Sequence, residues 1–394
     1  MMRYYWVGFD VGKAFHWVCV LDDEGEEVLS RKVEADEEDL EAACKEIERL
    51  DGERTVGIDL LSGPATLLEA VLLGRGERVF HVPGIAVNRA PDAYPGEAKS
   101  DSKDAHVIAD QLRLRRGSLH EVCPKDEITA QMRLLVAHRR DLLQDQTRRA
   151  ARLREVLLGV FPGLEAALDL KREGALLAVT RVATPAAARK LGVAHLCRWL
   201  KARDVRKAPD LAERIVEAAK AQRRELPAAE AKAALVAELA SEILRTRERI
   251  ADLDRRLEEL LTENPAAHIV RTLPGMGVVF TAEFIAEVGN LGRFVSADAL
   301  AAAAGVAPVL RASGATSYRR RARRGNKVLK RVLYRSAFSC ISHHERSEAF
   351  YRKKRAEGKG HHQAVIALAR RRVDVLWAML RDGQMYSERP SQVA

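Results

Sequence analysis

Four aspartates in the first quarter of the chain have side chains of the type that binds hard divalent cations: Asp10, Asp59, Asp101 and Asp104. Mg²⁺ prefers carboxylate oxygens, retains several waters and commonly binds phosphates as well. Asp101 and Asp104 are three residues apart, so on a helix they share one face with about 5–6 Å between their Cβ atoms. These residues could therefore form a nuclease-type metal site against a nucleic-acid phosphate.

Each of these aspartates falls at the end of a predicted strand or the start of a predicted helix. Runs of apolar, aromatic and β-branched residues typical of strands cover residues 4–10, 14–21, 55–60 and 78–82. The first two predict a hairpin that carries Asp10, and the acidic stretch from Ser100 predicts the first turn of a helix. An unpaired carboxylate at Asp59, inside an apolar strand, would be costly, so we expect a cation near it.

Each acid also has a simpler interpretation. Asp10 precedes a glycine-containing turn and Asp101 could cap a helix, and taken singly either role is commoner than catalysis. The combination of two strand-end acids with a helical pair favours a metal site. Cys340, His343 and His344 lack a fourth ligand at the usual spacing, and we find no Cys/His cluster for a softer metal. The expected cofactor is Mg²⁺ or Mn²⁺.

The composition favours a polyanionic partner. The chain has 394 residues, enough for two or three domains, and a formal net charge of +10. No CxxC motif occurs among the cysteines, so we expect reduced thiols and a cytoplasmic location; the cysteines are Cys19, Cys44, Cys123, Cys197 and Cys340. We find no signal peptide and no apolar run of about 18 residues, so no membrane partner is expected.

Long helical patterns begin near residue 125. Arginines unbalanced by nearby acids predict phosphate contacts, although a solvated helix face is the usual fate of such a run; they are Arg148, Arg149 and Arg152. Further on, residues alternate in steps of three and four, which predicts a coiled-coil seam; they are Val236, Leu239, Ile243, Thr246, Ile250, Leu253, Leu257 and Leu260. The seam implies helix pairing within the chain or between protomers.

The last third combines a glycine turn with a dense basic run. Residues 272–277 read TLPGMG and resemble the turn of a helix-hairpin-helix, in which Gly275 and Gly277 could offer backbone N–H groups to a phosphate. Eight basic residues without an acid follow, and such density predicts nucleic-acid binding; they are Arg319, Arg320, Arg321, Arg323, Arg324, Lys327, Lys330 and Arg331.

Ser313 lies just ahead of this basic run, in a polar stretch between apolar segments. A serine hydroxyl is a poor nucleophile unless a base, a metal or nearby cations activate it, and arginines follow within a few residues. For an isolated Ser-Gly pair, a simple turn would be the preferred interpretation.

These motifs together resemble one family over nearly the whole chain. VGFDVGK, YPGEAKSDSKDAHVIADQ, TLPGMG and GVAPVLRASGATSYRRRARRGN are similar to segments of the DEDD transposases of the insertion-sequence one-ten family, which are bridge-RNA-guided recombinases. The resemblance implies an α/β plus α fold in three parts. These are a RuvC-like, RNase H-type domain over 1–125, a helical coiled-coil region over 126–264, and a mainly helical transposase domain with a helix-hairpin-helix-like motif over 265–394. One position departs from the family, because its second acid is commonly glutamate and Asp59 stands here.

The resemblance also implies a mechanism. The four acids would bind Mg²⁺ at the scissile phosphate, and Ser313 would attack phosphorus to form a transient phosphoserine with DNA. The metal half and the serine half would come from different protomers of a dimer or tetramer. A non-coding guide RNA from the element would select target and donor DNA by base pairing, while the protein reads backbone and shape.

Three other classes remain open. A RuvC-like hydrolytic nuclease or resolvase would need the acids but not Ser313. A sugar kinase also begins with a strand such as GFDVG, but it would need a second phosphate-binding glycine loop and a less basic surface. A non-enzymatic nucleic-acid-binding protein would explain the arginines and leave the acids unexplained.

Overall fold

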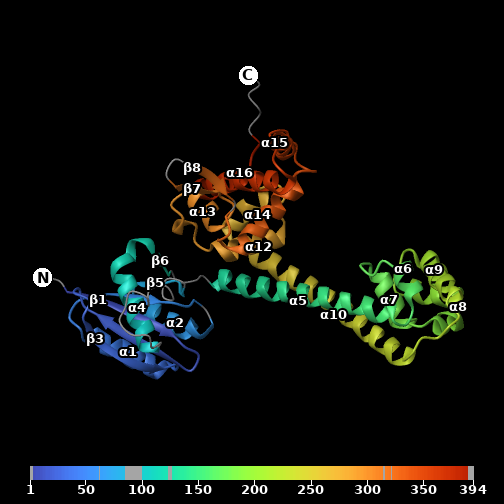
Figure 1. The fold of residues 1–394 in the computed structure, drawn as a ribbon, viewed down its shortest axis with the longest axis horizontal. Helices are drawn as coiled ribbons and strands as arrows, with labels where there is room; N and C mark the ends of the chain where they lie inside the picture. The colour runs from blue at the N-terminus through green and yellow to red at the C-terminus, as the bar shows by residue number, and fades with distance from the viewer. Residues whose placement is uncertain are drawn as a thin grey trace, which may run out of the picture. The chain divides into compact units, whose positions relative to one another are not determined.

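The computed structural model describes residues 3–61, 63–84, 100–122, 127–313, 316–320 and 322–388. The chain forms two compact units, Met1–Lys125 and Asp126–Ala394. The first is a sheet with helices and the second is mainly helical (Figure 1). The predicted combination of an α/β part with a helical part is therefore confirmed.

Unit 1 is built on a mixed sheet of six described strands in the order β3-β2-β1-β4-β5-β6. The strands are β1 (Tyr4–Val11), β2 (Phe15–Leu21), β3 (Glu27–Glu34), β4 (Glu53–Ile58), β5 (Val79–His81) and β6 (His120–Glu121). The predicted hairpin is confirmed, since β1 and β2 are antiparallel and Asp10 pairs with Trp17. β1, β4 and β5 are parallel neighbours. The predicted strand over 55–60 ends early, so Asp59 lies one residue beyond β4.

Helices cover both faces of this sheet. They are α1 (Glu37–Glu48), the short η1 (Gly63–Ala65), α2 (Thr66–Gly74), α4 (Asp101–Arg115) and the short η3 (Arg116–Ser118). Successive side chains of a strand point to opposite faces. Val7 and Phe9 of β1 accordingly share a buried core with residues of α1 and α2. The opposite face of β1 and β2 packs against Ala105 and Ala109 of α4.

Two glycines permit the close approach of α4 to the sheet. Gly8 of β1 and Gly57 of β4 are direct partners in the parallel register. A Cβ at Gly8 would lie 2.3 Å from the carbonyl oxygen of Ala105, and one at Gly57 would lie 3.1 Å from Ile108 Cγ2. Side chains at these positions would push α4 away, so glycine is required where backbone and helix meet.

Unit 2 consists mainly of helices. They are α5 (Glu127–Leu158), α6 (Pro162–Ala167), α7 (Glu173–Arg181), α8 (Pro185–Lys201), α9 (Ala208–Ala221), α10 (Ala229–Thr262), α11 (Pro265–Thr272), α12 (Val278–Val288), η4 (Leu291–Arg293), α13 (Ala297–Ala303), α14 (Lys327–Cys340), α15 (Glu345–Ala356) and α16 (His361–Asp382). A hairpin of β7 (Val309–Ser313) and β8 (Thr316–Arg320) joins α13 to α14. The last third was expected to be mainly helical, and this hairpin was not foreseen. In the part of the chain that the structure describes, no helix is long and apolar enough to span a membrane.

The predicted apolar seam pairs α10 with α5 of the same chain, along which the two helices run side by side (Figure 1). The start of the seam, including Val236 and Ile243, is buried with α6 to α9. Ile250 and Leu253 pack on Leu142 of α5. Leu257 is buried in the core that also includes α11, α12, α14 and α16. The pairing partner found here is therefore intramolecular.

The seam ends on two neighbouring leucines. The predicted Leu260 is half-buried and packs against the core, and Leu261, which was not predicted, is fully buried there. Because a straight helix has 3.6 residues per turn, a row of buried positions drifts from a strict heptad over the length of α10.

Candidate functional site

Three of the predicted acids converge at the end of the β1–β4 pair. Asp10 stands two residues beyond Gly8, and Asp59 two residues beyond Gly57, so each acid lies on the face that α4 covers. Asp104 directly precedes Ala105, the residue in contact with Gly8. The backbone N–H of Val11 donates to Oδ1 of Asp59 at 3.1 Å, which fixes the Asp59 carboxylate beside β1.

The electrostatics at Asp59 favour a bound cation. Burial raises the pKa of Asp59, and the negative charge of Asp104 raises it further. The N–H of Val11 and the charge of His81 lower the same pKa, but the net direction is upward. A carboxylate whose ionised form is disfavoured by burial and by a nearby negative charge is stabilised by a divalent cation bound beside it. The chemistry of these donors therefore suits Mg²⁺.

Asp101 has a less enclosed position than the other acids. It is the first residue of α4 and is exposed, while Asp104 one turn along is half-buried. The alternative that Asp101 caps the helix is wrong, because Ser100 is the N-cap and its Oγ accepts from the N–H of Lys103 at 3.3 Å. Asp101 thus has no capping role to account for it.

Two features near these acids were missed in the sequence. His81 is the last residue of β5, pairs with Ile58, and its Nε2 lies 3.2 Å from the carbonyl oxygen of Asp59. The expectation that no Cys/His cluster exists was wrong, because Cys19, Glu27 and His106 come together on β2, β3 and α4. Their spacing along the chain matches no metal motif. The one available signal for His81 was its position at the end of a strand parallel to the other two.

Ser313 is the last residue of β7, and its backbone pairs with Thr316 of β8. Ser313 and Thr316 are therefore the last residue pair of the β7–β8 ladder. Residues 314–315, which follow it, lie outside the described residues.

The basic run that follows divides into exposed and internally bonded residues. Arg323, Arg324 and Lys327 are exposed. Lys330 Nζ donates to the carbonyl oxygen of Ala322 at 3.0 Å, and Arg331 pairs with the buried Glu283 at 2.5 Å. Arg319 lies in β8, Arg320 buries an Nε without a hydrogen-bond partner among the described residues, and Arg321 lies outside them.

Arg331 therefore has a structural role beside any role in binding. Burial raises the pKa of Glu283, and Arg331 opposes that shift. Removing the guanidinium would leave a buried carboxylate without its cation, which is strongly destabilising.

The backbones at Gly305 and Gly325 approach each other closely, beside the exposed arginines. Gly305 and Gly325 have φ values of 65° and 110°, and a Cβ at Gly325 would lie 2.7 Å from the backbone nitrogen of Gly305. Asn326 then caps α14 by accepting from the N–H groups of Val328 and Leu329. Arg323 and Arg324 thus stand just before the N-terminus of α14, an end that also favours anions.

We expect the double change Arg323→Gln with Arg324→Gln to weaken DNA and RNA binding and to flatten its salt dependence. Each lost phosphate contact should reduce the slope of log K against log salt by about one unit. The measurement is a binding titration at several salt concentrations. Arg223 and Arg224, a second exposed adjacent pair, serve as the matched control when changed to Gln. An unchanged slope for the Arg323 and Arg324 variant would assign these residues to an ordinary solvated surface.

The predicted arginines of α5 already have acidic partners in part. Arg148 pairs with Asp145, and Arg149 pairs with Asp145 and with Glu242 of α10. Arg152 is exposed. The argument from a lack of balancing acids is therefore weakened, because Asp145 lies one turn before these arginines and Glu242 reaches them from a helix that is distant in sequence.

The TLPGMG segment joins α11 to α12, as the helix-hairpin-helix prediction requires. Its two glycines have different surroundings. Gly275 has φ 78°, and a Cβ there would lie 2.6 Å from Cys340 Sγ. Gly277 is exposed, and a Cβ there would meet nothing within 4 Å. Packing against α14 explains the need for Gly275, whereas Gly277 leaves the start of α12 open to a ligand.

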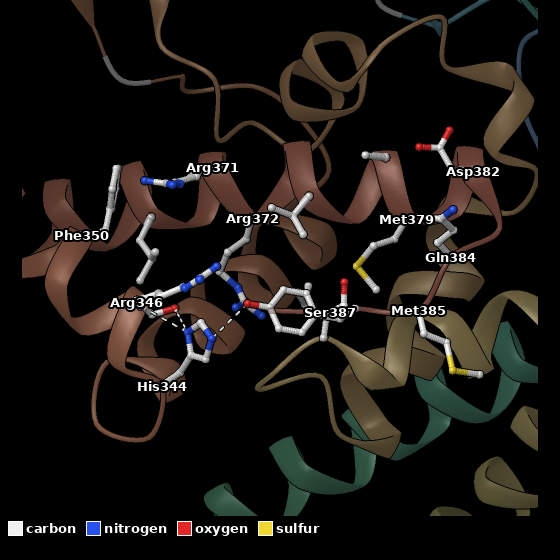
Figure 2. A pocket seen from close by; sticks show the side chains of 16 residues that line it. His344, Arg346, Phe350, Arg371, Arg372, Met379, Asp382, Gln384, Met385 and Ser387 are labelled. Carbon is white, nitrogen blue, oxygen red and sulfur yellow. Dashed lines mark hydrogen bonds between the residues drawn. The ribbon is translucent and has the colours of Figure 1, made fainter. Parts of the chain in front are cut away.

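The buried side chain of Arg372 on α16 supports this hairpin. Arg372 is 5% exposed and donates to the carbonyl oxygen of Pro274 and, at 2.8 Å, to Oγ of Ser336. Cys340 Sγ donates to the same Pro274 carbonyl at 3.0 Å. Figure 2 shows Arg372 among the side chains that line a cavity of about 370 Å³, with Arg346, Arg371 and His344. Arg372 and Cys340 therefore both bind the Pro274 carbonyl and fix the α11–α12 turn against α14 and α16.

The two glycines allow a paired test. We expect Gly275→Ala to reduce the free energy of unfolding by about 1–3 kcal/mol, because it combines a left-handed φ with a steric overlap. Gly277→Ala, at φ −76°, should change stability little. Thermal or urea unfolding of the two variants measures the difference. Equal stability losses would contradict the distinction between a packed and an open glycine.

Two family models and several known proteins match this chain. A family model described as a transposase matches residues 7–162, and a second, described as the transposase IS116/IS110/IS902 family, matches residues 267–352. The 44.8 kDa protein of insertion element IS116 from Streptomyces clavuligerus is 43% identical, with 98% of this chain and 96% of the relative covered. The 42 kDa protein of IS900 from Mycobacterium paratuberculosis is 40% identical over 97% of this chain and 96% of its own length. The 43.6 kDa protein of IS110 from Streptomyces coelicolor is 35% identical over 97% and 95%.

Proposed function

The chain belongs to the IS116/IS110/IS902 family of insertion-sequence transposases, and from this membership we propose that its acids and Ser313 are the two halves of one phosphoryl-transfer site. Transposases cut and rejoin DNA. The observation that carries the proposal for the acids is the Gly8–Gly57 pair, which brings Asp104 on α4 against the strand ends that bear Asp10 and Asp59.

In this proposal the acids form the metal half of the site, within a RuvC-like domain. Asp10, Asp59, Asp101 and Asp104 hold Mg²⁺ or Mn²⁺. The N–H of Val11 orients the Asp59 carboxylate, and His81 contacts the backbone carbonyl oxygen of Asp59. When bound, the cation polarises the scissile phosphate and offsets the charge that develops on it. The strand order β3-β2-β1-β4-β5 and the position of α4 support this assignment.

Ser313 supplies the nucleophile. Its hydroxyl oxygen forms a bond to phosphorus as the bond from phosphorus to the leaving DNA strand breaks, and the hydroxyl proton passes to the leaving oxygen or to solvent. The phosphoserine retains the energy of the cut phosphodiester, so a second strand can displace the serine and rejoin DNA without another energy source. The exposed cations Arg323, Arg324 and Lys327 neutralise the phosphates of the bound strands.

The resemblance also supports a guided and oligomeric enzyme. The metal half and the serine half of one active site come from different protomers of a dimer or tetramer, and an element-encoded RNA selects target and donor DNA. Sequencing the RNA that copurifies with the full-length protein tests the guide. A single structured species from the element supports it, whereas a mixture that reflects total cellular RNA would remove the guide from the proposal.

Asp59→Asn tests the metal half through stability. Because burial raises the folded-state pKa of Asp59, its ionised form destabilises the metal-free protein at pH values above that pKa. At pH values below the pKa of the unfolded chain, both states are protonated and this cost is absent. We therefore expect the Tm of Asp59→Asn without metal to exceed that of the wild type, by a margin that grows as the pH rises above about 4, the ordinary pKa of an aspartate, and levels off above the raised folded-state pKa.

Thermal unfolding in a chelator, and again with Mg²⁺, measures this. Mg²⁺ should raise the Tm of the wild type and not that of Asp59→Asn. Asp51→Asn, an exposed change in the same unit, is the control. A margin that does not vary with pH would show that Asp59 is ordinarily solvated.

A further inference from the structure

We propose that Cys19, Glu27 and His106 form a zinc site in unit 1, separate from the acidic site. Cys19 is a buried residue of β2, Glu27 begins β3, and His106 lies on α4. The three residues therefore come from three elements, and a metal bound by them would join α4 to the β2–β3 hairpin.

The spacing of the three ligand atoms carries the inference. Cys19 Sγ lies 3.5 Å from Glu27 Oε2 and 3.8 Å from His106 Nδ1, and Nδ1 lies 3.7 Å from Oε2. Tetrahedral Zn²⁺ with Zn–S near 2.3 Å and Zn–N and Zn–O near 2.0 Å separates its ligand atoms by about 3.3–3.6 Å. The three atoms are nearly equidistant, and each separation is within a few tenths of an ångström of that range.

Hydrogen bonding alone explains this triangle less well. A direct ion pair of His106 with Glu27 would bring N and O to about 2.7–2.9 Å, and 3.7 Å is well beyond that. The thiol of Cys19 donates to the carboxylate at 3.5 Å, an ordinary distance for a sulfur donor, so hydrogen bonding accounts for that side of the triangle. It does not account for the near equality of the three separations, which is the arrangement expected around a shared central ion.

The charge balance and ligand types favour zinc over magnesium. On binding, the Cys19 S–H bond breaks, its proton passes to solvent, and an Sγ–Zn bond forms. One thiolate, one carboxylate and one neutral imidazole then offset the two charges of Zn²⁺, which suits a site with a fully buried cysteine. A thiolate with an imidazole selects a softer cation than the all-carboxylate set of Asp10, Asp59 and Asp104. With three protein ligands, water completes the tetrahedron.

A zinc ion at this position would strengthen the packing of α4 on the β2–β3 hairpin. His106 is two residues from Asp104 and projects from a different side of α4, because two helical positions are about 200° apart. Ser102, one turn before His106, lies 3.4 Å from Ser30 of β3 through their hydroxyls, and Ser30 also accepts from Trp17 Nε1 at 3.0 Å. Zinc would reinforce this polar contact between the first turn of α4 and the β2–β3 hairpin.

Co²⁺ titration of the full-length, metal-stripped protein tests the proposal. Co²⁺ bound by a thiolate has an intense near-ultraviolet charge-transfer band that carboxylate-bound Co²⁺ lacks. We expect one such site per chain, displaced by Zn²⁺. Asp104→Ala should keep the band, which separates it from the acidic site. Cys44→Ser, a change at another buried cysteine of unit 1, is the matched control and should also keep it.

Two variants test whether Cys19 and Glu27 bind the metal. Cys19→Ser should lose the charge-transfer band, and Glu27→Gln, a change at an exposed side chain that leaves the core intact, should weaken Zn²⁺ binding at least about 100-fold. Zn²⁺ should also raise the Tm of the wild type and of Cys44→Ser. Absence of the band in the wild type, its persistence in Cys19→Ser, or unchanged Zn²⁺ affinity in Glu27→Gln would each overturn the site and leave a hydrogen-bonded cluster.

Discussion

Ser313→Ala is expected to abolish both DNA cleavage and strand rejoining, by at least about 10⁴-fold, while the protein still binds its nucleic acids. The reason is that the hydroxyl of Ser313 is the proposed attacking group, and alanine has no atom that can take its place. Single-turnover cleavage of labelled DNA, alongside a binding assay, measures the two properties separately. Ser317→Ala, a change at an exposed serine of the adjacent strand β8, is the matched control and should remain active.

The same experiment has a direct chemical readout. Wild-type protein denatured during reaction should carry labelled DNA covalently on the peptide that contains Ser313. A hydrolytic nuclease would use water instead and leave no such adduct. Cleavage by Ser313→Ala at the wild-type rate, with no adduct in the wild type, would replace the serine mechanism by hydrolysis at the acidic site.

Asp104→Ala is expected to reduce cleavage at least about 10³-fold without loss of nucleic-acid binding. Asp104 faces the strand ends that carry Asp10 and Asp59, and loss of one metal ligand removes several kcal/mol of transition-state stabilisation. Asp104→Asn, which is nearly the same size, should be equally inactive if the charge is what matters.

Glu38→Ala is the control for this change. Glu38 is an exposed acid in the first turn of α1, so its removal has a similar effect on a helix N-terminus without touching the site. Cleavage by Asp104→Ala at the rate of Glu38→Ala would contradict the metal assignment. It would indicate that Asp104 only stabilises the N-terminus of α4.

Much of the local structure was predictable because it depends on short-range patterns. The alternation of apolar residues in 4–10 and 14–21 predicts the β1–β2 hairpin, and the serine and acids from Ser100 predict the start of α4. The seam on α10 follows from its apolar spacing. These features are decided by side-chain periodicity and capping, which operate over a few residues.

The resemblance of the motifs added what periodicity could not. The motifs by themselves indicate the family, and relatives that match over nearly the whole chain confirm that membership. The resemblance also selected Ser313 from among the serines of the chain, a choice that remains a prediction. Local pattern alone favoured a simple turn at Ser313, and the β7–β8 hairpin there was missed because a short polar strand has little apolar alternation.

The register of the sheet and the packing of its helices were decided only in three dimensions. No sequence pattern predicts that Gly8 and Gly57 pair with each other. Their pairing nevertheless leaves the space in which α4 packs on the sheet, and it places Asp104 near Asp59. The same is true of Arg331 with Glu283, and of Cys19, Glu27 and His106, whose separations along the chain match no motif. Side chains far apart in sequence meet because tertiary packing, which minimises exposed apolar surface and steric overlap, sets which strands and helices become neighbours.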